Sequence, residues 1–170
     1  MPIAARAAAN LLAGVGQVLA VIPFERARLR RTLEAAGCEI LETDRTARGM
    51  GSSLAAGVEA SARASGWIVA LGDMPVIHVE TIAAVKRALE AGARIAAPFD
   101  AGGRRGHPVG FSSALLGELV ALDGDAGARV ILERHADAIA RIETQDAGIF
   151  VDIDTPQDLA ALSSGRPSGG

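Results

Sequence analysis

The chain has few aromatic side chains and a single cysteine. Phe and Trp together make up 3% of its 170 residues, and tyrosine is absent. Nucleic-acid grooves use stacking rings and positive charge, whereas this chain has a formal charge of −3 and no basic stripe, so nucleic acid is excluded as a partner. The single Cys38 excludes an internal disulfide, and its place in an apolar stretch predicts a small buried hydrophobe rather than a nucleophile.

Several other signals are also missing. No apolar run is long enough to cross a bilayer. The alanine-rich residues 1–13 lack the basic start and compact apolar centre of a signal peptide, so we expect a helix in a cytoplasmic protein with no membrane partner. Neither a Gly-x-Gly-x-x-Gly turn after a strand nor a Walker loop is present. With one cysteine and dispersed histidines, a zinc site is not predicted.

What the chain does have is an alternation of helical and extended segments. Hydrophobic residues make up 49%, mostly Ala, Val, Leu and Ile, which suits helices packed on a buried sheet. The order predicts an α/β domain with a mostly parallel sheet and crossover helices. We expect strands at residues 67–71, the clearest buried strand, and 150–153, before a closing helix at 155–162. The domain would cover residues 1–162, with a disordered tail over 163–170.

The strongest local feature is the segment Leu71-Gly72-Asp73-Met74-Pro75, directly after the predicted strand 67–71. In an open α/β sheet, ligands bind beyond the carboxyl ends of the strands. A carboxylate at this point, on a turn fixed by Gly72 and Pro75, is well placed to hold a cation. An aspartate that only caps the turn or the next helix explains the segment equally well.

A second acidic segment, Asp152-Ile153-Asp154-Thr155-Pro156, lies at another predicted strand end. Alternation places Asp152 and Asp154 on the same side of that strand. Two acidic strand ends could share Mg²⁺, which binds one or two carboxylates together with substrate phosphates. Asp154 or Thr155 would also cap the last helix, which leaves Asp152 or the other Asp154 oxygen free.

A glycine turn, Gly49-Met50-Gly51-Ser52-Ser53, precedes a predicted helix that Ser52 or Ser53 would cap. Backbone amides at such a turn attract anions or the polar edges of a base. Many ordinary loops share this pattern, so it indicates little by itself.

Two basic segments complete the set. The loop 103–109 offers Arg104 and Arg105 to a phosphate, while a lone His107 is more often structural than catalytic. The segment 124–129 would cap a helix and end in an arginine that helix solubility explains adequately.

In this order, the five segments resemble the MobA-like nucleotidyltransferase family, and they look closest to the MocA branch of molybdenum cofactor cytidylyltransferases and related maturation proteins. The resemblance extends over residues 1–162. It implies a three-layer, Rossmann-like, mostly parallel sheet with helices on both faces, of the nucleotide-diphospho-sugar transferase type. It also implies Mg²⁺-dependent transfer of a nucleoside monophosphate to a molybdopterin phosphate, with release of pyrophosphate.

The resemblance assigns roles to residues. Asp73 corresponds to the main metal aspartate, and Asp152 or Asp154 to the second ligand, so that Asp73 and Asp154 form the catalytic pair. The segment 49–53 would line the nucleotide, and its form favours CTP over GTP. The other positions expected to bind substrate are Gly72, Pro75, Gly106 and His107, of which the last two would face the acceptor phosphate.

The sequence departs from the family at its start. Relatives are expected to begin with a strand and a Leu-Ala-Ala-Gly-type loop whose arginine and lysine hold the triphosphate, whereas this sequence starts at the following helix. Lacking that first strand, the sheet would have unpaired neighbouring edges, and transfer would lose its main charge neutralisation. Either the recorded start lies downstream of the natural one or the chain is an inactive remnant. We favour the first, because the remaining motifs are intact.

Other functions stay open. One is a nucleotidyltransferase that uses GTP or another phosphorylated acceptor, such as a sugar phosphate or phospholactate. Another is a non-catalytic carrier or chaperone for the molybdenum cofactor, with a molybdenum enzyme as its partner. A protein-interaction module would leave both acidic strand ends unexplained. The sequence does not determine the nucleobase, the acceptor or the oligomeric state, and every enzymatic interpretation requires residue 73 to converge with 152 or 154.

Overall fold

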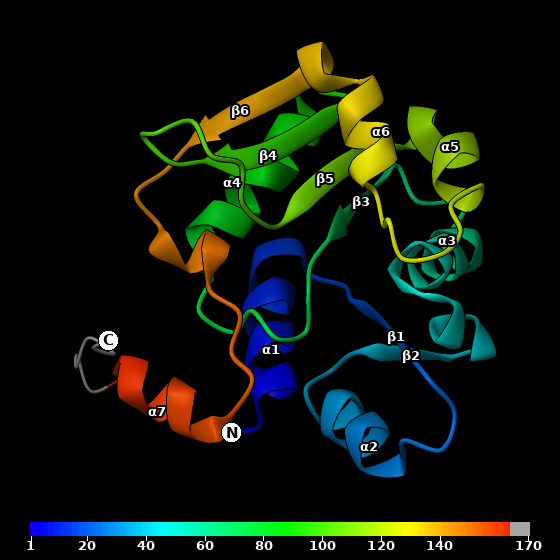
Figure 1. Cartoon of the computed structure of the whole chain (residues 1–170), viewed down its shortest axis with the longest axis vertical. Helices are drawn as coiled ribbons and strands as arrows, with labels where there is room; N and C mark the ends of the chain where they lie inside the picture. The colour runs from blue at the N-terminus through cyan, green and yellow to red at the C-terminus, as the bar shows by residue number, and fades with distance from the viewer. Residues whose placement is uncertain (164–170) are drawn as a thin grey trace.

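The structure, a computed structural model, describes residues 1–163; the predicted tail lies outside the described residues except for its first position. Figure 1 shows helices and strands alternating along the chain. The helices are α1 (Ile3–Val15), α2 (Ala27–Ala35), α3 (Met50–Ala60), α4 (Val79–Glu90), α5 (Leu116–Val120), α6 (Arg129–Arg134) and α7 (Pro156–Ser163). The strands are β1 (Leu19–Ile22), β2 (Glu39–Glu42), β3 (Gly66–Val69), β4 (Ile95–Phe99), β5 (Val109–Ser112) and β6 (Ile139–Glu143). Short 3-10 helices are η1 (Asp44–Arg48), η2 (Ser113–Leu115), η3 (Ala136–Ala138) and η4 (Ala147–Phe150).

The larger sheet has the order β3-β5-β4-β6, and a separate sheet pairs β1 with β2 in parallel. Strand β4 runs parallel to β6, but β5 runs antiparallel to both of its neighbours. The mostly parallel sheet that the sequence predicts is therefore mixed. The reason is the loop 100–108 between β4 and β5, which is shorter than the crossover of about a dozen residues that parallel neighbours need.

Helices cover both faces of the larger sheet, so the predicted α/β layering is confirmed. Figure 1 shows α4 behind this sheet and α6 in front of it. Strand β4 is buried at all of its positions, and the core around it includes Phe111, Leu115 and Ile131, each 0–1% exposed. In the part of the chain that the structure describes, no helix is both long and apolar enough to cross a membrane.

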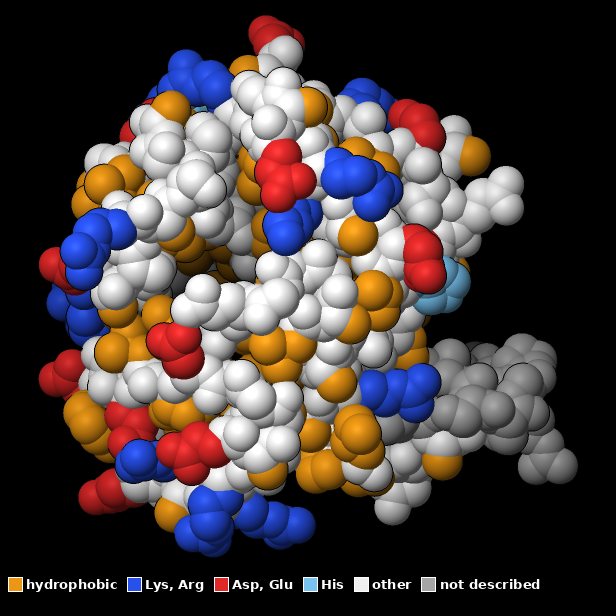
Figure 2. Space-filling view, turned by 180° about the vertical axis from the view of Figure 1, so that it is seen from behind, with side chains coloured by type: hydrophobic (Ala, Val, Ile, Leu, Met, Phe, Trp, Pro, Cys, Tyr) orange, Lys and Arg blue, Asp and Glu red, His pale blue; other side chains and the backbone are white. Residues whose placement is uncertain are grey.

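The two sheets do not join. Among the described residues, β1 pairs only with β2 and β3 pairs only with β5, so each has an edge without a ladder partner, as the sequence leads us to expect. Strand β3 is consequently half-buried rather than the fully buried strand predicted for residues 67–71. Seen from behind, the surface has a hollow lined by hydrophobic side chains, and basic and acidic side chains are interspersed over that face without a basic stripe (Figure 2).

Two local predictions are wrong. Residues 150–153 do not form a strand, because η4 ends at Phe150 and the chain then runs irregularly, bonded through Ile153 N to the backbone oxygen of Asp73 at 2.7 Å. Helix α3 begins at Met50 with Gly49 at its N-cap, so neither Ser52 nor Ser53 caps it.

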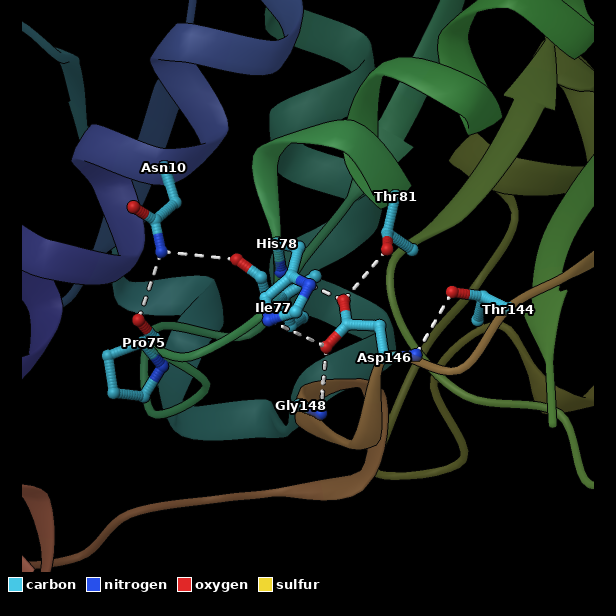
Figure 3. A network of polar contacts seen from close by, with 8 residues as sticks. All are labelled: Asn10, Pro75, Ile77, His78, Thr81, Thr144, Asp146 and Gly148. Carbon is cyan, nitrogen blue, oxygen red and sulfur yellow. Dashed lines mark hydrogen bonds and ion pairs between the residues drawn. The ribbon is translucent and has the colours of Figure 1, made fainter. Parts of the chain in front are cut away.

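A buried aspartate, Asp146, joins the loop after β6 to the start of α4 (Figure 3). Asp146 is 5% exposed. Its carboxylate accepts hydrogen bonds from His78 N and Thr81 Oγ1, both at 2.8 Å, and from Gly148 N at 2.9 Å. Its own backbone N–H donates to Thr144 Oγ1 at 3.1 Å. Because a buried carboxylate is costly without donors, these bonds fix the two segments relative to each other.

Helix α1 holds the same region from the opposite side. Asn10 Nδ2 donates to the carbonyl oxygens of Pro75 and Ile77 at 3.0 and 3.1 Å, as Figure 3 shows. Gly148 lies so close to the carbonyl oxygen of Val76 that a Cβ there would collide with it. The turn that follows β3 is thus fixed from two directions.

Replacing Asp146 should destabilise the fold because it leaves three donors without their acceptor. We expect Asp146→Ala to lower the free energy of unfolding by about 3 kcal/mol and Asp146→Asn by about 1–2 kcal/mol. Urea unfolding followed by circular dichroism measures both values.

The matched control is Asp137→Asn, at an exposed position of η3, which should change the free energy of unfolding by less than about 0.5 kcal/mol. An Asp146→Ala protein as stable as this control would show that the network does not hold the two segments together.

Candidate active site

Three segments meet around an open pocket of about 350 Å³. They are the turn after β3, the loop before β5 and the irregular chain after η4. All three lie at one end of the larger sheet, because β3 and β6 end there and the antiparallel β5 begins there. The lining residues are Leu71, Asp73, Met74, Arg105, Gly106, His107, Ile149, Phe150 and Asp152.

Backbone contacts lock these segments together. His107 N donates to the carbonyl oxygen of Ile149 at 3.0 Å, and Ile153 N donates to that of Asp73 at 2.7 Å. Gly106 lies against Ile149, where a Cβ would stand 2.6 Å from the Ile149 Cβ. Only a residue without a side chain allows this approach, which explains the glycine before His107.

The structure brings Asp73 and Asp152 to the same pocket, and both are solvent-exposed. Asp154 is exposed but does not line it, since Ile153, 2% exposed, is buried between the two aspartates. The helix cap belongs to Thr155, whose Oγ1 accepts from Asp158 N at 3.2 Å. Of the two alternatives that the sequence leaves for a second acidic group, the pocket thus contains Asp152.

These carboxylates suit a hard divalent cation that takes part of its ligands from the protein and part from the substrate. Within the described residues, no three His, Cys, Asp or Glu side chains are arranged to hold a metal ion by themselves. Asp73 and Asp152 supply oxygen donors only, on the rim of a pocket open to solvent. Mg²⁺ is commonly bound by one or two carboxylates, substrate phosphates and water, and the two aspartates fit that mode.

The two neighbouring arginines of the loop before β5 have different surroundings. Arg104 Nε donates to Asp100 Oδ2 at 2.8 Å, and its guanidinium lies 4.3 Å from the centre of the Phe150 ring. The backbone N–H of Arg104, and then its side chain, hold the pKa of Asp100 below its usual value. Arg105 lines the pocket, and its side chain has no hydrogen bond or ion pair with any described residue. Arg105 is therefore the cation available to an anionic ligand.

His107 lines the pocket together with Arg105 and Asp73. Burial, and then the Arg105 guanidinium, lower the pKa of His107 below its ordinary value, against the opposing effect of the Asp73 carboxylate. Its Nδ1 is buried without a hydrogen-bond partner among the described residues. A neutral imidazole on the wall of the pocket follows from these surroundings.

The structure does not bring the segment 49–53 to this pocket. Gly51 N donates to the carbonyl oxygen of Gly124 at 2.7 Å, and Ser52 Oγ bonds the carboxylate of Asp123. The Ser52 hydroxyl, and then the Gly124 N–H, hold the pKa of Asp123 below its usual value. The polar groups of this glycine turn thus bond the loop before α6.

Of the other four positions expected to bind substrate, two line the pocket and two do not. Gly106 and His107 line the pocket, whereas Gly72 and Pro75 do not. Pro75 is fully buried, which agrees with a role in fixing the turn. No sequence motif marks Ile149 and Phe150 as pocket walls, or Asp146 as their support. The signal that could have indicated Asp146 is its spacing from Gly148, because an aspartate two residues before a glycine favours an Asx turn.

The chain also resembles known proteins. The family model of the MobA-like NTP transferase domain matches residues 1–139, which is most of the chain. A search of curated proteins finds no significant match.

Solved structures of similar fold include nucleotidyltransferases. The Rv0371c protein of Mycobacterium tuberculosis H37Rv in complex with manganese is 21% identical, with a TM-score of 0.77 over 97% of this chain and 87% of that one. Its homologue from Mycobacterium sp. strain JC1 is 27% identical, with a TM-score of 0.72 over 93% and 81%. A cytidylyltransferase from Leptospira borgpetersenii is 15% identical, with a TM-score of 0.72 over 96% and 75%. The chain therefore belongs to the MobA-like NTP transferase family and is a nucleotidyltransferase.

Proposed function

We propose that this nucleotidyltransferase transfers CMP from CTP to the phosphate of a molybdopterin-type cofactor, with Mg²⁺ as its metal and pyrophosphate as the second product. The observation that carries the proposal is the presence of Asp73 and Asp152 in one pocket with the unpaired Arg105. Two carboxylates and a guanidinium are what a reaction between phosphates requires.

The reaction joins two phosphates without a protein nucleophile. An oxygen of the acceptor phosphate attacks the α-phosphorus of the nucleotide and forms a new P–O bond. The bond from the α-phosphorus to the oxygen bridging to the β-phosphorus breaks, and its electron pair leaves with pyrophosphate. Because a phosphate monoester is largely ionised near neutral pH, no side chain has to remove a proton.

Each residue of the pocket then has a task. Asp73 and Asp152 would hold the divalent cation, which when bound withdraws charge from the phosphate oxygens. Arg105 would offset the negative charge of the acceptor phosphate as it approaches the α-phosphate. The neutral His107 adds no second positive charge beside the metal ligands and is able to donate one hydrogen bond. Positioning and electrostatics account for most of the rate enhancement in phosphoryl chemistry.

Similarity to known proteins supports the choice of metal, nucleotide and acceptor. Manganese in the Rv0371c protein favours an oxygen-preferring divalent cation, a class to which Mg²⁺ belongs. The fold shared with a cytidylyltransferase favours CTP. The MobA-like family favours a molybdopterin acceptor.

Pyrophosphate release with CTP or GTP, over a panel of phosphorylated acceptors, tests the base and the acceptor together. A chain that binds the pterin but ignores both nucleotides would instead be a cofactor carrier.

Replacing Asp73 should abolish most of the activity. We expect Asp73→Asn to lower kcat about 100-fold or more and to weaken Mg²⁺-dependent CTP binding, because the amide removes one negative charge from the metal site. Pyrophosphate release and calorimetry with Mg-CTP, each over a range of Mg²⁺ concentrations, measure these changes.

The exposed Asp137→Asn again serves as the control for the loss of one carboxylate and should leave both readouts unchanged. Full turnover by Asp73→Asn at low Mg²⁺ would contradict the metal role.

The second aspartate can be identified by comparing two neighbours. We expect Asp152→Asn to lower kcat at least about tenfold more than Asp154→Asn, because only the residue at 152 lines the pocket. Equal losses in the two variants, or a larger loss at 154, would refute this choice. The same pyrophosphate assay measures both.

The two arginines should also separate. Arg105→Gln should lower kcat/KM about tenfold to 100-fold, because it removes the unpaired cation of the pocket. Arg104→Gln should change kcat/KM less than threefold, since Asp100 already neutralises that guanidinium. A larger effect at 104 than at 105 would show that the loop rearranges when substrate binds.

A further inference from the structure

A second open pocket, of about 420 Å³, adjoins the first. It lies between α6, the beginning of β6 and the loop that joins β4 to β5, on the face of the sheet that α6 covers in Figure 1. We refer to it as the arginine pocket. Its lining residues are Phe99, Gly103, Arg105, Arg129, Leu132, Glu133, Ala136, Ile139 and Arg141.

Positive charge predominates in the arginine pocket, where three guanidinium groups face one carboxylate. Arg129 Nε lies 3.3 Å from Glu133 Oε1, but both side chains are about 70% exposed, at 73% and 68%, so this pair is weak and readily exchanged. Arg141 Nε lies 3.5 Å from Glu143 Oε1, at the limit of a hydrogen bond. The terminal nitrogens of Arg141 bond no described residue, which leaves them free for an anion.

The base of the arginine pocket is apolar. Phe99 and Leu132 are 8% and 5% exposed, and Ile139 is partly buried beside them. The Arg141 guanidinium lies over the Phe99 ring at 3.9 Å from its centre, which holds the cation at the edge of the apolar surface. An apolar base with cations at its rim suits a ring or hydrocarbon body that carries anionic groups.

Arg105 lines both pockets. A ligand in the arginine pocket that extends to Arg105 would therefore present that end to the pocket of Asp73 and Asp152. This connection makes the arginine pocket a candidate for the second substrate rather than an isolated surface feature.

We propose that the arginine pocket binds the acceptor, and that the acceptor is an organic phosphate with an apolar or planar body and a second anionic group. The reactive phosphate lies at Arg105, the body lies against Phe99, Leu132 and Ile139, and the second anionic group is held by Arg129 and Arg141. That the ligand is the acceptor of the reaction rests on the proposed function. The chemical class of the ligand is inferred from the residues that line the arginine pocket.

Two simple probes test the second anionic contact. Phenyl phosphate carries a ring and one phosphate, and 4-carboxyphenyl phosphate adds one carboxylate. In calorimetry on the full chain, 4-carboxyphenyl phosphate should bind about tenfold more tightly than phenyl phosphate, because it gains charge-assisted hydrogen bonds. In the double variant Arg129→Gln/Arg141→Gln, the two probes should bind equally.

Arg87→Gln, at an exposed position of α4 remote from the arginine pocket, controls for the general loss of positive charge and should keep the tenfold difference. Equal binding of the two probes to the unmodified chain, or a difference that persists in the double variant, overturns the proposal. Circular dichroism checks that the double variant is folded, as we expect for two exposed side chains. A failure of the proposed function appears separately, as absent Mg-CTP binding.

Discussion

The placement of the buried Asp146 carboxylate is the constraint on which the site depends. By accepting from the start of α4 and from the loop after β6, it joins the segment that carries Asp73 to the segment that carries Asp152. Neither aspartate is rigid by virtue of its own secondary structure, since one lies on a turn and the other on irregular chain. Their shared pocket is therefore a product of a hydrogen-bond network one layer beneath the surface.

Charge in this region is distributed so that one cation remains free. Asp100 neutralises Arg104 and holds it over Phe150, which builds the wall of the pocket, while the adjacent Arg105 stays unpaired. Two neighbouring residues of the same type thus differ in their ion pairing because of a single carboxylate four residues upstream of Arg104. Arg105 also lines both the pocket of Asp73 and Asp152 and the arginine pocket, so that one side chain lies between the two proposed substrates.

The order of the elements and the presence of two acidic segments could be predicted locally. A buried apolar run followed by Gly72-Asp73 marks a strand end, close to Val69, where β3 ends. The direction of β5 follows from the loop 100–108, which has too few residues for a parallel crossover, but the length of that loop is known only once the ends of β4 and β5 are fixed. The segment 150–153 looks like a strand by composition, but the Ile153 N–H bonds the carbonyl oxygen of Asp73 and the Val151 N–H bonds that of Gly148, instead of a sheet edge.

The sequence by itself determined the α/β class, the family and the pair of acidic segments, because these depend on hydrophobic periodicity and on short motifs that neighbouring residues specify. Only the tertiary structure decided which aspartate lies in one pocket with Asp73 and which arginine is unpaired. It also decided that residues 49–53 bond the 123–125 loop instead of lining the pocket of Asp73 and Asp152. The first and the last of those outcomes depend on the long-range partners Asp146 and Gly124, and a residue's own neighbours in sequence do not encode which distant group will satisfy it. The pair of Arg104 and Asp100 spans only four residues, but it requires the turn that this loop adopts in the folded chain.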